Sequence, residues 1–284
     1  MTLSDLGDAA LVIIGHGTTR NADSCAPVYQ HAAELRRRRL FAEVREAFWK
    51  QEPQVQGVLK DLSRQRVLIV PFFLSEGYFG GRVILRELGF APDGGEETRF
   101  LRRDGRTLVY CRAVGTDPKM AGVVLARARE VTKRFPFPRA PQLGEVTLVI
   151  AGHGTERDPG SRRAVERQVE LIRGMNLYAA VEAVFLEEAP RIGECYGMAR
   201  TRNLVVVPFF LSDGLHVRED IPVRLGESER VVKERLEAGK PTWRNPTERG
   251  GKLVWYASGV GTEPLMAEVI LDRVMEAAGG GENP

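Results

Sequence analysis

The sequence predicts an α/β protein made of two homologous three-layer αβα domains, each with a mainly parallel sheet. β-branched apolar runs alternate with helical patterns, which is typical of βαβ units. Motifs of the first half also recur: Gly-His-Gly-Thr at 15–18 and 152–155, and Val-Pro-Phe-Phe-Leu-Ser at 70–75 and 207–212. Both pairs are 137 residues apart, so we infer a duplication with halves related by an approximate twofold.

Each predicted element follows from its residue pattern. Near-continuous Val, Ile and Leu runs indicate buried parallel strands, near 10–15, 44–49, 67–71, 107–112, 146, 181, 205 and 253. Helical patterns occupy the first-half segments between these strands, at 25–39, after 53, and at 81–88 and 117–134. A third motif, Val-Gly-Thr before Asp-Pro or Glu-Pro, repeats after 146 residues. The second half therefore carries a longer excursion, between 226 and 252.

The segment that joins the halves, 135–141, contains three prolines and cannot continue a helix. We place the boundary there, which gives an N-terminal domain over 1–138 and a C-terminal domain over 139–284.

Composition excludes several classes of protein. The 284 residues carry a formal charge of only +3, too small to predict a nucleic-acid partner. No apolar run reaches the length of a membrane span. Three cysteines without a CxxC pair argue against a disulfide framework and favour a reducing, cytoplasmic location.

Two histidines stand just beyond strand ends in the second half, His153 and His216. The carboxyl edge of an open α/β sheet is where ligands bind, and the first and third strands of such a half can be neighbours. We therefore expect both imidazoles in one crevice. Neutral imidazole is the commonest transition-metal ligand in proteins.

A carboxylate at the end of the second strand, Glu187 or Glu188, could complete a two-histidine, one-carboxylate metal set. The corresponding first-half residues are Lys50 and Gln51, and Tyr78 stands near the position equivalent to His216. The first half is therefore expected to lack a metal site.

These motifs, with Gly-Leu-His-Val-Arg-Glu-Asp-Ile-Pro at 214–222, resemble the sirohydrochlorin cobaltochelatase family in its long, internally duplicated form. The resemblance implies a chelatase-like fold and a class II chelatase, a lyase of cobalamin or siroheme biosynthesis. Such an enzyme inserts Co²⁺ into sirohydrochlorin without a nucleotide, and relatives insert Fe²⁺ or Ni²⁺. By motif position, His153, His216 and Glu187 are the implied catalytic and metal-binding residues.

The tetrapyrrole substrate is flat and apolar with carboxylates around its rim, so aromatic and cationic residues are expected to bind it. The predicted substrate-binding residues are His16, Tyr78, Arg157, Phe210 and Arg218. Neither a nucleic acid nor a membrane partner is expected, and the chain is predicted to be a monomer or a homodimer.

Two other functions remain open at this point. One is a non-catalytic tetrapyrrole or metal carrier. The other is a phosphatase using His16, because His-Gly-Thr-Thr-Arg-Asn at 16–21 resembles the histidine phosphatase motif. That motif has an arginine before its histidine, whereas this sequence has Gly15.

Overall fold

The computed structural model describes residues 6–18, 24–77, 83–90, 98–155 and 159–279. The first-half elements are β1 (Ala10–Gly15), α1 (Ala26–Arg38), β2 (Glu43–Phe48), α2 (Val55–Asp61), β3 (Arg66–Pro71), α3 (Ile84–Glu87), β4 (Phe100–Arg103), β5 (Arg106–Tyr110) and α4 (Met120–Arg134). The second-half elements are β6 (Val146–Gly152), α5 (Pro159–Gly174), β7 (Ala180–Phe185), α6 (Cys195–Met198), β8 (Asn203–Pro208), α7 (Ile221–Arg224), α8 (Glu229–Glu237), β9 (Thr247–Arg249), β10 (Lys252–Tyr256) and α9 (Met266–Gly279).

The strands form two five-stranded sheets of the same topology, ordered β2-β1-β3-β5-β4 and β7-β6-β8-β10-β9. Four strands of each sheet run parallel, and the last is antiparallel. The predicted α/β fold is confirmed. The antiparallel edge strands β4 and β9 were not predicted, because they are short and carry arginine instead of an apolar run. Charged residues are typical of exposed edge strands.

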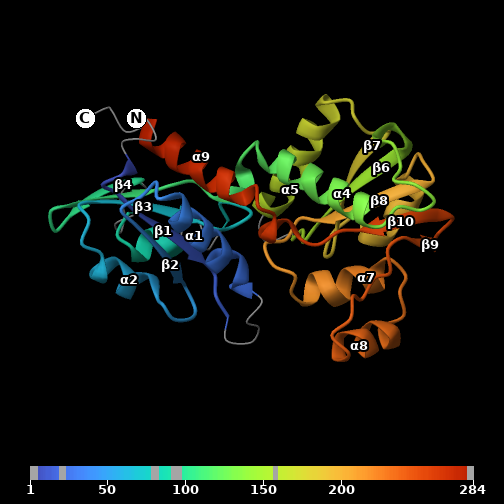
Figure 1. The fold of residues 1–284 in the computed structure, drawn as a ribbon, viewed down its shortest axis with the longest axis horizontal. Helices are drawn as coiled ribbons and strands as arrows, with labels where there is room; N and C mark the ends of the chain where they lie inside the picture. Colours follow the sequence, from blue (N-terminus) through green and yellow to red (C-terminus); the bar gives the residue numbers. More distant parts are fainter. Residues whose placement is uncertain (1–5, 19–23, 78–82, 91–97, 156–158, 280–284) are drawn as a thin grey trace. The chain divides into compact units, whose positions relative to one another are not determined.

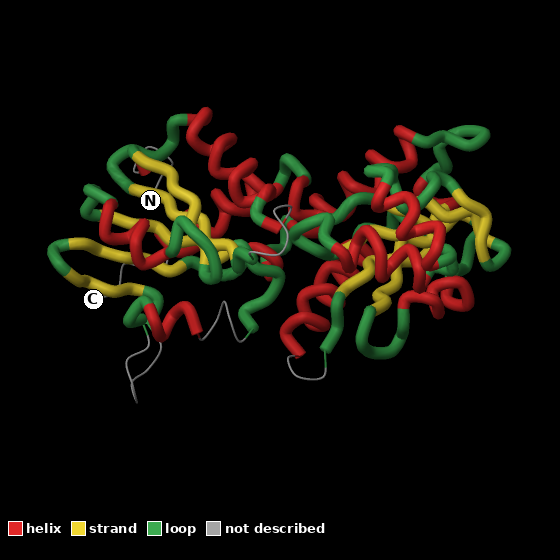
Figure 2. Tube along the Cα trace, turned by 90° about the horizontal axis from the view of Figure 1, so that it is seen from below, coloured by secondary structure: helices red, strands yellow, loops and turns green. Residues whose placement is uncertain are grey.

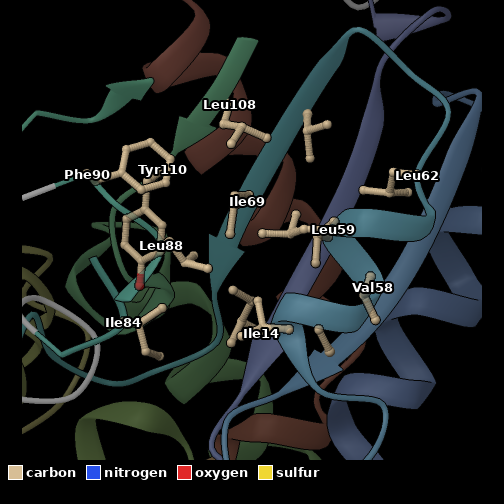
Figure 3. Close-up of a cluster of buried hydrophobic side chains, with 14 of the residues drawn as sticks. Ile14, Val58, Leu59, Leu62, Ile69, Ile84, Leu88, Phe90, Leu108 and Tyr110 are labelled. Carbon is tan, nitrogen blue, oxygen red and sulfur yellow. The ribbon is translucent and has the colours of Figure 1, made fainter. Parts of the chain in front are cut away.

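Helices cover both faces of the first sheet, which explains the uninterrupted burial along β1. Figure 3 shows one face, where Ile14 and Ile69 pack beside Val58 and Leu59 of α2. Helices α1 and α9 contact each other and the strands β1 and β3. The second sheet has the same layers, with α6 and α7 supplying residues to one core and α4 packed with α5. Figure 2 shows the strands in yellow and the helices in red.

The compact units of the structure do not follow the order of the repeats. One unit contains residues 1–117 and 264–284, and the other contains residues 118–263. Helix α9 therefore packs on β3 of the first sheet, and α4 packs on β8 of the second (Figure 1). The predicted boundary at 138 follows the sequence repeat. In the structure, the helix that closes each repeat, α4 or α9, packs on the sheet of the other repeat, and we call these two the exchanged helices. The assignment of 1–138 and 139–284 as homologous domains stays a prediction about the repeat.

Two buried arginines hold the exchanged helices in place. Arg127 of α4 donates hydrogen bonds to the Gly259 carbonyl, 3.0 Å, and to Thr262 Oγ1, 2.6 Å. Arg273 of α9 donates in the same way to the Ala113 carbonyl, 3.1 Å, and to Thr116 Oγ1, 2.8 Å. Each helix is thus tied to the Val-Gly-Thr loop of the sheet that it covers.

No helix within the described ranges is long and apolar enough to cross a membrane. Cys25, Cys111 and Cys195 are all buried free thiols.

Candidate metal centre

Two glycines shape the turn that presents His153 at the end of β6. A Cβ on Gly152 would lie 2.6 Å from Val165 Cγ2 of α5, and Gly154 has a φ of +64°. Only glycine suits both positions, because the first allows a close approach of helix and strand and the second has a left-handed backbone. The chain therefore leaves the sheet sharply, and the half-buried imidazole lies at its carboxyl edge.

The hydrogen bonds of His153 establish which ring nitrogen can bind a ligand. His153 Nδ1 lies 2.8 Å from the Gly154 carbonyl oxygen. A carbonyl can only accept, so Nδ1 carries the proton and the neutral ring has its lone pair on Nε2. Nε2 lies 3.7 Å from Glu187 Oε1, and the Glu187 backbone N–H donates to the His153 carbonyl at 3.0 Å.

His216 begins a π-helical turn, η7 (His216–Asp220), which follows β8. Its Nδ1 lies 2.6 Å from Asp220 Oδ2, and an ionised carboxylate likewise accepts a hydrogen bond from the Nδ1–H group. Nε2 is again left with the lone pair. Hydrogen bonding of the second ring nitrogen to an oxygen acceptor is the usual arrangement around metal-binding histidines, and π-helical turns are frequent at functional sites.

The two histidines meet because β6 and β8 are adjacent strands. Their ring centroids are 5.1 Å apart with an interplanar angle of 81°. Phe210 stands beside both, with centroids 6.4 Å from His153 and 5.9 Å from His216. The preceding Phe209 is buried in the core. The predicted convergence of the imidazoles is thus present, and their role as metal ligands stays a prediction.

The structure distinguishes Glu187 from Glu188, which the sequence could not. Glu187 faces His153 and is 56% exposed. Glu188 is 17% exposed, and its Oε2 pairs with Arg162 at 2.9 Å. Glu188 also packs against the Gly154 backbone, and its Oε1 has no hydrogen-bond partner within the part of the chain that the structure describes. Glu187 is therefore the carboxylate available to a ligand.

The corresponding place in the first unit has the opposite charge. Lys50 occupies the position equivalent to Glu187, and its backbone N–H donates to the His16 carbonyl at 2.9 Å. Burial lowers the pKa of His16 below its ordinary value; the Lys50 charge lowers it further, and a hydrogen bond to Gly17 partly opposes both. A cation beside a histidine repels a divalent metal ion, so His16 has a different electrostatic setting from His153.

A loop network behind the histidines was not predicted. The Gly259 backbone N–H donates to Asp213 Oδ1 at 2.7 Å, and the Gly261 N–H donates to the Phe210 carbonyl at 3.1 Å. Arg127 binds the same loop, as described above, so α4 supports the segment between β8 and His216. The repeated Val-Gly-Thr motif was the available signal, because a Cβ on Gly261 would lie 1.9 Å from the Leu211 carbonyl oxygen.

The other predicted substrate-binding residues are Tyr78, Arg157 and Arg218. Tyr78 and Arg157 fall outside the described residues. Arg218 is two residues after His216 on η7 and lines a cleft beside that turn. In the described ranges, no group of three or more His, Cys, Asp or Glu side chains is arranged to hold a metal ion as it stands.

The CbiX family model matches residues 10–131 and, a second time, residues 147–277. The chain belongs to the CbiX family. A relative from Halobacterium salinarum, named a probable sirohydrochlorin cobaltochelatase, is 39% identical over 279 residues, which is 94% of this chain and 91% of the relative. This CbiX protein is thus a class II chelatase, a lyase.

Solved structures agree with the CbiX assignment. A multi-domain protein from Deinococcus radiodurans, described as structurally similar to chelatases, has a TM-score of 0.76 and 30% identity over 97% of this chain. The CbiX chain spans 55% of that protein's length. SirB from Bacillus subtilis with Fe³⁺ has a TM-score of 0.67 and 19% identity over 97% of both chains, which shows a shared fold.

Proposed function

We propose that this protein inserts Co²⁺ into sirohydrochlorin without a nucleotide, with His153, His216 and Glu187 binding the metal ion. The observation that carries the proposal is the hydrogen bonding of the imidazoles. In both, Nδ1 is bound to an oxygen acceptor and Nε2 keeps its lone pair, which is the state a metal ligand requires. The name of the Halobacterium relative, a probable sirohydrochlorin cobaltochelatase, supports metal insertion.

The proposed site forms when the ion arrives. His216 and Glu187 are 53% and 56% exposed, so their side chains can rotate toward His153 without disturbing the core. Two imidazoles and one carboxylate leave coordination positions open. An ion held in this way can be passed to another ligand, which a chelatase requires because the metal is its substrate.

The face around the histidines suits a flat apolar ring. Phe210 is half-buried beside both imidazoles, and Leu215, directly before His216, is 64% exposed. The macrocycle would lie against these side chains. As the metal passes to the ring nitrogens, the freed Glu187 carboxylate and the freed Nε2 of His153 would each accept one of the two pyrrole N–H protons.

The test is an anaerobic absorbance assay of sirohydrochlorin with Co²⁺, Fe²⁺ and Ni²⁺ in parallel, without nucleotide. We expect turnover with the parent protein, fastest with Co²⁺, and loss of turnover in His153→Ala and His216→Ala. His16→Ala is the matched control, because His16 occupies the equivalent turn beside Lys50 and is expected to affect turnover less.

Stoichiometric binding without turnover would identify a carrier instead. Hydrolysis of a phosphoester without added metal, lost in His16→Ala, would support the phosphatase alternative. If His216→Ala binds and inserts Co²⁺ as the parent does, the metal-site assignment is wrong.

A further inference from the structure

A cleft of about 920 Å³ lies on the second unit beside the histidine-bearing turn. Its walls come from α4, η7, α8, β10 and the segment 238–245. This volume is in the upper part of the range for small-molecule sites. His153, Glu187, Phe210 and His216 are not among its lining residues, so the cleft is separate from the face on which metal binding is proposed.

The longer excursion of the second half builds one wall of this cleft. Within it, Thr242 and Trp243 are buried, and Trp243 packs on Tyr256 of β10 with ring centroids 6.1 Å apart. Arg235 of α8 donates a hydrogen bond to the Thr242 carbonyl at 2.9 Å. The additional residues thus form a packed wall, which indicates a preformed site.

The cleft carries uncompensated positive charge. Across the described ranges, Arg134, Lys240 and Arg244 line the cleft without forming an ion pair. Two acidic lining residues already form ion pairs, Glu130 with Arg127 and Glu234 with Arg230. Asp213 likewise accepts a hydrogen bond from the Gly259 N–H. The charge balance favours an anionic ligand.

Apolar side chains also line the cleft. Val131 and Phe135 line the α4 side, and Val217 lines the η7 side. Inorganic anions gain nothing from such surface, whereas a ligand with an apolar body and several carboxylates is complementary to both features. Residues two apart on a helical turn point in different directions, so Arg218 can face the cleft while His216 faces His153.

We propose that this cleft is a second binding site for a carboxylated tetrapyrrole, on the side of η7 away from the metal-binding face. The inference rests on the proposed function, because a chelatase handles a substrate and a product with the same apolar ring and carboxylate rim. The site would hold one tetrapyrrole while another occupies the histidine face.

The experiment is a calorimetric titration with uroporphyrin, a metal-free tetrapyrrole with carboxylates around its rim. We expect the parent to bind two molecules per chain. Lys240→Glu with Arg244→Glu should weaken one of these binding events roughly tenfold or more, since charge-assisted hydrogen bonds are lost. The control, Lys60→Glu with Arg64→Glu, makes the same charge change on exposed first-unit residues and should leave both events intact.

Co²⁺ binding to the cleft variant reports independently on the histidine face and should equal that of the parent. One tetrapyrrole per chain in the parent, or identical titrations of parent and cleft variant, would overturn the second site. Equally effective displacement by inorganic phosphate would also overturn it, because the cleft would then be a simple anion site. Failure of metal insertion by the parent, with these titrations as expected, would count against the proposed function alone.

Discussion

Glu187 lies 3.7 Å from His153, and the same backbone geometry places Lys50 beside His16 in the first unit. Duplication has therefore produced two similar histidine turns with opposite neighbouring charges. Only the turn with the carboxylate is matched to a divalent cation.

The hydrogen bond from His216 to Asp220 should control metal affinity. Asp220→Ala removes the acceptor that keeps the proton on Nδ1, so we expect Co²⁺ binding to weaken roughly tenfold to a hundredfold. Asp220→Asn, which retains a carbonyl acceptor, should recover part of the loss. Glu219→Ala is the control on the same turn. Co²⁺ titration followed by cobalt absorption measures all three, and equal affinities for Asp220→Ala and Glu219→Ala would contradict the role.

The adjacent glutamates should separate metal binding from stability. Glu187→Gln is expected to weaken Co²⁺ binding with little change in unfolding free energy, because this side chain is exposed. Glu188→Gln should cost about 1 kcal/mol of stability by weakening a partly buried charged hydrogen bond to Arg162. Denaturant unfolding and Co²⁺ titration on the same samples give both quantities. The reverse pattern would show that Glu188 is the ligand.

The lowered pKa of His16 predicts that the folded protein is less stable at acidic pH. Because the folded-state pKa is lowered, the unfolded chain binds the proton more readily, and stability falls as pH drops below ~6.5, the reference value. Lys50→Glu should raise the His16 pKa and reduce this acid sensitivity, whereas Lys60→Glu should not. NMR titration of the His16 ring measures its pKa. Melting temperatures at pH values above and below ~6.5 measure the acid sensitivity. An unchanged His16 pKa in Lys50→Glu would exclude the charge effect.

Arg127 and Arg273 form a matched pair for testing the exchanged helices. Both are almost fully buried and hydrogen-bonded to equivalent loops, so replacing either by methionine should destabilise its unit by about 3–5 kcal/mol. Only Arg127→Met should also weaken Co²⁺ binding, because its loop contacts Asp213 and Phe210. Unfolding curves and Co²⁺ titrations test this at a temperature where both variants are folded. Equal metal affinities would show that α4 does not support the site.

Two glycines should respond in opposite directions to alanine. Gly261→Ala places a Cβ against the Leu211 backbone, 1.9 Å from its carbonyl oxygen, and should cost about 3 kcal/mol or more through strain. Gly122→Ala lies in α4, where a Cβ has nothing within 4 Å, and should stabilise by about 0.5–1 kcal/mol. Thermal unfolding of both variants decides the matter, and a neutral Gly261→Ala would refute the packing argument.

The sequence by itself determined the two α/β sheets, their parallel strands and the meeting of His153 and His216. Those features depend on local patterns, because apolar runs define buried strands and Gly-His-Gly requires a sharp turn at a strand end. Adjacent parallel strands then bring their carboxyl ends together. The internal repeat was visible for the same reason, since each motif kept its spacing.

Only the tertiary structure decided which sheet each closing helix covers, and which of Glu187 and Glu188 faces the histidines. The amphipathic pattern of α4 shows which face is apolar, but not which sheet receives it; buried Arg127 and its long-range hydrogen bonds set that choice. Neighbouring glutamates have the same local propensities, and Glu188 is distinguished by its ion pair with Arg162 of α5. These outcomes depend on contacts between distant residues, which no local pattern contains.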